Sequence, residues 1–354
     1  MDKETRLKIY KQIENAGLVI YYNKLLLSFT TWKIGGEAEA FLQITNKDEF
    51  IKIFKIVQLE NLPYFLLGGG SNILVSDEGF KGLVIKNDYQ DINYLDEIQV
   101  TQSLNKTPSV IKKETHWREG LLKLQDIDYE ESTSLKTRVN VSSGTILQQT
   151  VNKTLDQGLT GLQWFSGIPG TIGGAVYNNI HGGTKHFGDF IEVVEIIVDA
   201  EIKDLSPSDL DMKYDYSLLH KHNFPVVSVT LLLDHGDVER AKTSAVEWTK
   251  RKTIQPRNSC GSVFKNLDPK IASSVGLENP SAGYIIDSVL KMKGLKIGGV
   301  QVYENHANFI VNNGGGTASD VYKLVKLIKD RAKKEIGIEL EEEFVYVGEF
   351  KNDA

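Results

Sequence analysis

Two glycine-rich segments carry the residue types best suited to holding a phosphate-bearing ligand. They are Leu66–Leu74 and Ser166–Ala175, and each contains a hydroxyl side chain. Glycine lets the backbone approach a ligand closely and adopt positive φ, so that consecutive N–H groups can surround phosphate oxygens. One such loop is a weak signal, but two favour a dinucleotide whose pyrophosphate is held from both sides; the alternative is two tight turns. The predicted cofactor-binding residues are Gly68, Gly69, Gly70, Ser71, Asn72, Ser166, Gly167, Ile168, Pro169, Gly170, Thr171 and Gly174.

Metal and disulfide chemistry find no support in the sequence. The chain has one cysteine, Cys260, which excludes an internal disulfide and a cysteine zinc site. Its seven histidines show no H-E-x-x-H spacing or similar cluster. We therefore predict no metal.

The elements that must position the first glycine loop follow a strand–helix–strand pattern. Residues 40–45 and 63–67 read as strands, and apolar positions between Phe50 and Val57 indicate an amphipathic helix. The loop then lies at the carboxyl end of a strand, where sheets of α/β type place ligands. A strand at 82–86 follows instead of a helix, which disfavours an ordinary dinucleotide fold with a G-x-G-x-x-G loop.

The second glycine loop lies in a region rich in β structure. A strand at 138–142 leads into a helix with Ile146, Val151 and Leu155 inward, and further strands are expected at 192–199 and 226–233. Residues 88–137 are polar and irregular, which indicates a hairpin or surface insertion.

A change of pattern near residue 235 indicates a domain boundary. Beyond it we expect a helix through Val238 and Trp248, a loop from Gln255 to Gly261, and mixed elements to Asn313. A last long helix should open at Thr317, where Asp320 completes a capping box.

Composition bounds the class of protein. Of 354 residues, 41% are hydrophobic and 25% are charged, with a formal net charge of −6. This balance is ordinary for a globular protein and argues against a nucleic-acid partner. No apolar run approaches the ~20 residues of a membrane helix, and the first residues lack the apolar core of a signal peptide. We expect a cytoplasmic protein without a membrane partner, as a monomer or weak oligomer.

Seven sequence blocks together resemble one enzyme family, UDP-N-acetylenolpyruvoylglucosamine reductase. The resemblance runs from about residue 25 to residue 350, interrupted by the polar segment, and looks like the family branch without the extra substrate-covering loop. The blocks are Thr30–Gly36, Gly68–Asn72, Gly161–Tyr177, Cys260–Asn266, Ala282–Asp287, His306–Asn312 and Leu340–Gly348.

The resemblance implies an α+β fold. It implies an FAD-binding domain of the vanillyl-alcohol-oxidase type in two α/β subdomains, and a C-terminal α+β substrate-binding domain. We expect subdomain 1 over 1–87, with 336–354 returning to it. Subdomain 2 would span 88–235, including an insertion near 95–137, and the substrate-binding domain 236–335. The implied cofactors are non-covalent FAD and NADPH as hydride donor, and the implied partner is a sugar nucleotide.

The same resemblance implies roles for individual residues. Ser262 lies at the family's proton-donor position, and Glu343 matches the glutamate that orients or relays to the substrate carboxylate. Tyr214, Lys265 and Asn266 match substrate-binding positions. In isolation, Ser262 could equally be a turn serine, Glu343 part of a solvated strand edge, and Lys265 a surface lysine.

One catalytic position departs from the family pattern. The family expects an arginine that stabilises the reacting carboxylate, and this chain has Asp215 there. An aspartate repels the anion that an arginine would bind. Either a nearby cation (Lys213, His220, Lys221 or Arg257) substitutes, or the substrate differs, or activity is weak. His181 also replaces a family residue near the expected flavin or substrate, and an Asp–His pair is chemically plausible.

Two other functions stay open at this point. One is a flavoprotein oxidase or dehydrogenase of the same fold that acts on another small molecule. The other is a catalytically silent homologue that binds a sugar nucleotide, which the aspartate favours and the retention of Ser262 and Glu343 disfavours.

Overall fold

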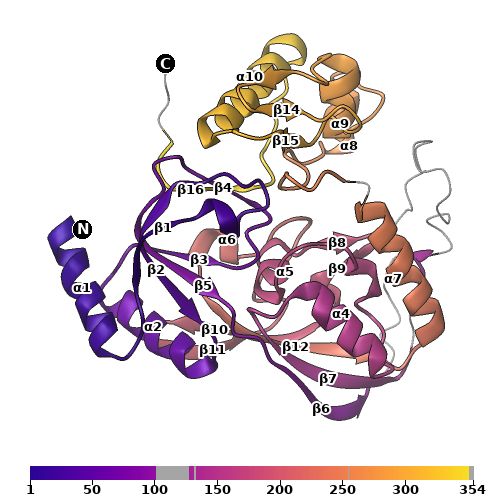
Figure 1. Ribbon diagram of the computed structural model, residues 1–354. Coiled ribbons are helices and arrows are strands. Elements are labelled where there is room, and N and C mark those ends of the chain that lie inside the picture. Colours follow the sequence, from indigo (N-terminus) through magenta and orange to yellow (C-terminus); the bar gives the residue numbers. More distant parts are fainter. Residues whose placement is uncertain (101–126, 131–132, 254, 351–354) are drawn as a thin grey trace.

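A computed structural model describes residues 1–100, 127–130, 133–253 and 255–350. Within these residues the chain forms two larger sheets and a smaller C-terminal body (Figure 1). The mixture of helices and both parallel and antiparallel strands confirms the predicted α+β class.

The first sheet positions the first glycine loop. Its strand order is β1-β2-β5-β3, with β1 antiparallel to β2 and the other neighbours parallel. Apolar side chains of the two N-terminal helices, among them Tyr10 and Phe54, are fully buried in its core. The elements are α1 (Lys3–Asn15), β1 (Tyr21–Leu25), η1 (Leu27–Phe29), β2 (Glu37–Ile44), α2 (Lys47–Leu59), β3 (Tyr64–Leu67) and β5 (Phe80–Asn87).

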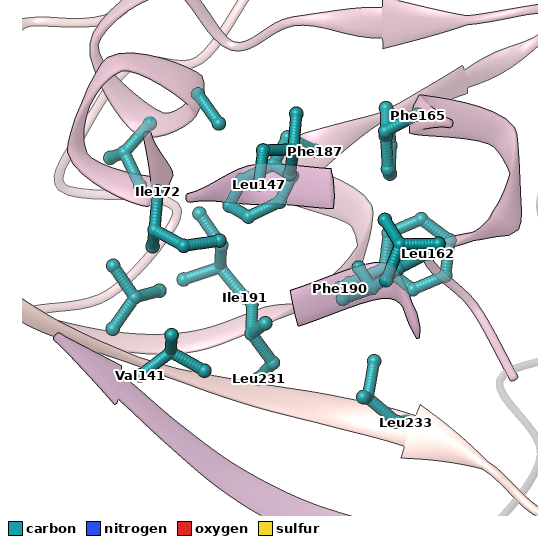
Figure 2. Close-up of a cluster of buried hydrophobic side chains, with 14 of the residues drawn as sticks. Val141, Leu147, Leu162, Phe165, Ile172, Phe187, Phe190, Ile191, Leu231 and Leu233 are labelled. Atoms are coloured by element: carbon teal, nitrogen blue, oxygen red, sulfur yellow. The ribbon is translucent and has the colours of Figure 1, made fainter. Parts of the chain in front are cut away.

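The second sheet positions the second glycine loop. It is fully antiparallel, in the order β11-β10-β12-β7-β6. Its alternating inward residues, such as Val141 and Leu231, pack beneath helices and short helical turns (Figure 2). The elements are β6 (Ile92–Gln99), β7 (Leu135–Ser142), α4 (Leu147–Asp156), η3 (Gln163–Phe165), α5 (Ile172–Asn178), β8 (His181–Gly182), β9 (Lys185–His186), η4 (Phe187–Phe190), β10 (Ile191–Val198), β11 (Glu201–Leu205), α6 (Leu219–His222), β12 (Val226–Asp234) and α7 (Val238–Thr253).

The C-terminal body has its own core around helix α10 and a three-stranded sheet of order β13-β14-β15. Thr317 and Asp320 form the predicted capping box of α10. The elements are α8 (Pro269–Ser274), α9 (Ala282–Tyr284), a π-helical turn η5 (Ile285–Val289), β13 (Lys296–Ile297), β14 (Val300–Val302), β15 (Ile310–Asn312) and α10 (Ala318–Ile336).

The end of the chain returns to the first glycine loop. Strand β16 (Val345–Val347) pairs in parallel with β4 (Ile73–Val75), which directly follows that loop. The indole N–H of Trp32 donates to the carbonyl of Ile310 at 2.8 Å, and this bond ties the C-terminal body to the N-terminal part of the chain. Residues distant in sequence are thereby brought to one place (Figure 1).

Three expectations from the sequence need correction. Residues 92–99 form edge strand β6 antiparallel to β7, which agrees with the hairpin alternative, but the insertion expected near 95–137 is too long at both ends. Ile127 and Tyr129 are also buried in the second core, whereas the expected insertion at 101–126 and 131–132 lies outside the described residues. Exposed Ile146 precedes helix α4 instead of packing inward.

The third correction concerns helix α7. The change of pattern near residue 235 assigns this helix to the C-terminal domain, yet its residues Ala241, Ala245 and Trp248 pack in the core of the second sheet. The core of the C-terminal body consists instead of residues from Cys260 onward together with Trp32, Ile34 and Leu74. A helical pattern reveals which face is buried but not which core receives it.

Candidate functional site

The two glycine loops meet at a cavity of about 920 Å³. A Cβ on Gly69 would lie 2.7 Å from the Cα of Gly170, so the loops touch through bare backbone. The Ser71 hydroxyl also donates to the carbonyl of Pro169 at 3.0 Å. The predicted pairing of the loops is therefore present in the fold.

Local backbone geometry explains why glycine is needed in the first loop. Gly70 has φ +64°, and a Cβ there would lie 1.8 Å from the carbonyl oxygen of Phe29. No side chain can occupy that space. The loop is consequently held against the segment before β2 while its other face remains open to the cavity.

The second loop ends in a helix cap. Thr171 is the N-cap of α5, and its hydroxyl accepts a hydrogen bond from the N–H of Gly174 at 3.4 Å. A Cβ on Gly68 would lie 2.7 Å from the Thr171 hydroxyl oxygen, so the first loop also packs on this cap. The cap thereby fixes the two loops relative to each other.

These loops fit the pyrophosphate of FAD. In the part of the chain that the structure describes, the backbone N–H groups of Gly69, Gly70 and Ser71 donate no hydrogen bond. Free N–H groups in a glycine cradle are the donors that a phosphate oxygen requires. The cavity is also lined by Tyr64, Leu147 and other apolar side chains, which suit aromatic rings.

Most of the predicted site residues line this one cavity, but two do not. Ser166 is fully buried behind its loop, and its hydroxyl has no hydrogen-bond partner among the described residues. Lys265 lies outside the lining, with its ammonium nitrogen 3.6 Å from a carboxylate oxygen of Glu341. The predicted residues that do line it are Gly68, Gly69, Gly70, Ser71, Asn72, Gly167, Ile168, Pro169, Gly170, Thr171, Gly174, Tyr214, Asp215, Ser262, Asn266 and Glu343.

Backbone hydrogen bonds bring Glu343 and Ser262 to the same wall. The N–H of Glu343 donates to the carbonyl of Val263 at 2.9 Å, and the Asn72 side chain donates to the carbonyl of Glu343 at 2.9 Å. The N–H of Val263 in turn donates to Asn308 at 2.8 Å. The backbone at Ser262 and Glu343 is thus held by the first glycine loop and the C-terminal body.

Glu343 and its neighbour Glu342 occupy different environments, as predicted, although both precede strand β16 and the alternation of a strand does not separate them. Glu342 forms a 2.6 Å ion pair with Lys329 and does not line the cavity. Burial, and to a smaller extent the negative charge of Asp215, raise the pKa of Glu343 to about 8, against the opposite effect of Lys252 and Lys265. Glu343 is therefore mostly a neutral acid at pH 7, able to donate a hydrogen bond.

Asp215 pairs with His181, 34 residues earlier in the chain. An oxygen of the carboxylate lies 3.1 Å from Nδ1 of the imidazole, and both residues line the cavity. The predicted substitute Lys213 is occupied elsewhere, because its ammonium nitrogen lies 2.7 Å from Asp211. Of the other suggested cations, Arg257 lines the cavity, whereas Lys221 and His220 do not.

Tyr214 joins this group through its ring. Its centroid lies 4.7 Å from that of His181, and its hydroxyl interacts with the side chains of Asn266 and Asp215. Burial raises the pKa of Tyr214, and the negative charge of Asp215 adds to the effect, so that the phenol stays protonated.

One cavity residue escaped the sequence prediction. Lys252, at the end of α7, lines the cavity and acts electrostatically on Glu343. The only signal in the sequence is the basic run Lys250–Lys252 just before the loop that leads to Ser262. A charge run on a helix is usually solvated, and its position over the cavity depends on tertiary packing.

The described residues show neither a cluster of metal ligands nor a membrane-spanning helix. Among the residues that the structure describes, no group of three or more histidine, cysteine, aspartate or glutamate side chains could hold a metal ion. Within the same residues, no helix has the length and apolar character needed to cross a membrane.

Two parts of the chain match known protein-family models. Residues 254–347 match the UDP-N-acetylenolpyruvoylglucosamine reductase C-terminal domain, and residues 117–201 match an FAD binding domain. A reductase of this name from Rubrobacter xylanophilus is 31% identical and covers 93% of this chain and 95% of its own. One from Trichormus variabilis is 32% identical, covering 92% of this chain and 86% of its own.

A solved structure shows the same arrangement. The crystal structure of UDP-N-acetylenolpyruvylglucosamine reductase from Thermus caldophilus aligns with a TM-score of 0.66 and 28% identity, over 93% of this chain and 98% of that one. Together with the FAD domain match, this confirms the predicted FAD-binding fold with a C-terminal domain. Because the relatives align over nearly the whole length, the chain belongs to the UDP-N-acetylenolpyruvoylglucosamine reductase family.

Proposed function

We propose that this protein is an FAD-dependent oxidoreductase that uses NADPH to reduce UDP-N-acetylglucosamine enolpyruvate to UDP-N-acetylmuramate, a step of peptidoglycan precursor synthesis. One observation carries the proposal: the two glycine loops, Ser262 and Glu343 line a single cavity. A flavin and a reducible substrate must share one space for hydride transfer. The names of the aligned relatives supply the substrate.

Ser262 and Glu343 match the needs of this reaction. Bound FAD supplies the hydride that adds to one vinyl carbon of the enolpyruvyl group. Negative charge then accumulates on the substrate carboxylate, where a neutral Glu343 can donate a hydrogen bond. Ser262 donates the proton to the second vinyl carbon.

The proposed cofactor is non-covalent FAD. Covalent attachment in this superfamily uses histidine, cysteine or tyrosine, and neither glycine loop contains any of them. Cys260 lines the cavity, but burial raises the pKa of its thiol, which keeps it a poor nucleophile. Denaturation should release all yellow colour from the protein; colour retained on the unfolded chain would refute this proposal.

The substrate side of the cavity is proposed to be the wall that carries Tyr214 and Asn266. Lys265 is proposed to act on the substrate diphosphate from just outside the lining, as a point charge. A reductase that consumes NADPH and a nucleotide sugar draws both from the cytoplasm, where we place this protein as a monomer or weak oligomer.

The two half-reactions provide the test. The purified protein should be yellow, should bleach with NADPH, and should regain its colour when the enolpyruvyl sugar nucleotide is added. Ser262→Ala should leave the bleaching intact and slow the recolouring by ~10²-fold or more. Ser274→Ala, a serine of helix α8 outside the cavity lining, is the matched control.

Two outcomes would favour another function. A yellow protein that bleaches with NADPH, yet is recoloured only by oxygen or another small molecule, would be a flavoprotein oxidase or dehydrogenase. A protein that binds the sugar nucleotide without any redox change would be a catalytically silent homologue. The aspartate at position 215 is the feature that favours this alternative. A colourless native protein would refute the FAD assignment.

A further inference from the structure

The cavity contains two acidic side chains where the proposed substrate brings a carboxylate. Asp215 and Glu343 both line it, and Glu343 is mostly neutral at pH 7. A negative ligand beside the Asp215 carboxylate would still be repelled unless a cation compensates. Among the described lining residues, the side chains able to carry positive charge are His181, Lys252 and Arg257.

The contact between His181 and Asp215 is fixed by the backbone around it. The Asn179 side chain donates to the carbonyl of Lys213 at 2.8 Å, and the Ser217 hydroxyl donates to the carbonyl of Tyr177 at 2.7 Å. On one segment these two bonds lie two residues to either side of Asp215, and on the other both shortly precede His181, the two residues of the 3.1 Å contact. The segments 177–181 and 213–217 are therefore locked together, and the imidazole is held at the aspartate.

The environment of Asp215 favours a positive charge beside it. Asp215 is only 8% exposed, and its second carboxylate oxygen is buried without a hydrogen-bond partner among the described residues. A buried carboxylate is costly unless a positive charge compensates it. Histidine can supply that charge in the physiological pH range.

Several other groups face this pair. The rings of Tyr214 and His186 have centroids 4.7 and 6.1 Å from that of His181. Burial raises the pKa of Glu343 and lowers that of His220, and the negative charge of Asp215 raises both pKa values. The positive charge of Lys265 lowers both. The nearest ring partners, a phenol and a second imidazole, thus bring no further carboxylate to the pair.

The other two cations are placed less favourably. The stem of Lys252 packs on the second glycine loop, because a Cβ on Gly167 would lie 2.9 Å from the Lys252 Cβ. Arg257 also lines a second cavity between the 256–258 loop and β14. His181 alone is ion-paired to the aspartate that influences Glu343.

We propose that protonated His181, held by Asp215, binds the carboxylate of the substrate. This inference rests on the proposed function. His181 contacts the ligand, and Asp215 is a positioning residue that orients the ring and stabilises its charge. The site then presents an imidazolium and a neutral Glu343, two hydrogen-bond donors, to one anion.

Binding of two probes to the FAD-loaded protein tests this inference. Calorimetric titration with UDP-N-acetylmuramate probes the carboxylate site, whereas UDP, which lacks a carboxylate, reports the rest of the pocket. His181→Gln should weaken UDP-N-acetylmuramate binding about tenfold or more at pH 6 and leave UDP binding unchanged. His186→Gln, which alters a neighbouring ring outside the cavity lining, is the matched control.

A variant that keeps the positive charge separates His181 from Glu343. In a Glu343→Gln background, His181→Gln should still weaken the binding of UDP-N-acetylmuramate. His181→Arg in the same background should retain this binding, because arginine stays charged. Asp215→Asn should weaken binding as well, although it removes a negative charge.

The inference is overturned if His181→Gln binds UDP-N-acetylmuramate as tightly as the unchanged protein, or if Asp215→Asn binds it more tightly. A protein that binds neither UDP nor UDP-N-acetylmuramate would instead refute the proposed function, and this inference with it.

Discussion

Replacing Glu343 with glutamine should stabilise the protein in a pH-dependent way while impairing the substrate half-reaction. Burial raises the pKa of this carboxyl from 4.5 to about 8, so the folded protein holds a proton that the unfolded chain releases. The stabilising effect of that proton is complete below pH 4.5 and is lost as pH rises towards 8. The raised pKa lowers the free energy of unfolding by about 4 kcal/mol between pH 5 and pH 9.

Glutamine is nearly isosteric with the neutral acid and carries no titratable proton. Glu343→Gln should therefore match the stability of the unchanged protein near pH 5 and exceed it by about 4 kcal/mol at pH 9. Urea unfolding of both proteins at pH 5, 7 and 9, followed by tryptophan fluorescence, measures the difference. Stopped-flow reoxidation by the enolpyruvyl substrate should be slower in the variant, because an amide is a weaker donor to the developing charge.

Glu342→Gln is the matched control for this experiment. Glu342 is paired with Lys329 outside the cavity, so its replacement should bring no gain in stability at alkaline pH. If Glu343→Gln and the unchanged protein lost stability in parallel between pH 5 and pH 9, Glu343 would titrate normally. The assignment of a neutral acid at the site would then be wrong.

Three further changes test other parts of the site and fold. Gly69→Ala should weaken FAD binding by about tenfold or more, since its methyl group would lie 2.7 Å from Gly170 and overpacking costs about 1–3 kcal/mol; flavin fluorescence titration measures this. Asp215→Arg should not accelerate the substrate half-reaction by more than about tenfold, because the arginine would stand at a backbone φ of +49° in a site arranged around His181. A larger gain in stopped-flow reoxidation would contradict the proposal that His181 has taken over the role of the family arginine. Thr317→Ala should cost about 1 kcal/mol of stability through loss of the α10 cap, with FAD binding intact, as urea unfolding and flavin absorbance would show.

The sequence identified the loops because their chemistry is local, and it identified the catalytic candidates through the resemblance to a known family. Positive φ at Gly70 and the Thr171 and Thr317 caps depend on a few neighbouring residues, which a sequence displays directly. The predicted separation of Glu343 from Glu342 is present, although strand β16 starts only at Val345. The polar pattern misled about where the insertion begins, because residues 95–99 still belong to a strand that is stabilised by its place at the edge of a sheet.

Tertiary structure alone decided which of these residues act together. Packing assigned α7 to the second core and carried Lys252 to the cavity, while Lys265 was left outside the lining. The pairing of His181 with Asp215 joins segments 34 residues apart, and no periodicity or spacing encodes such a contact. The raised pKa of Glu343 has the same origin, because desolvation and charge repulsion depend on atoms that only the folded chain brings near it.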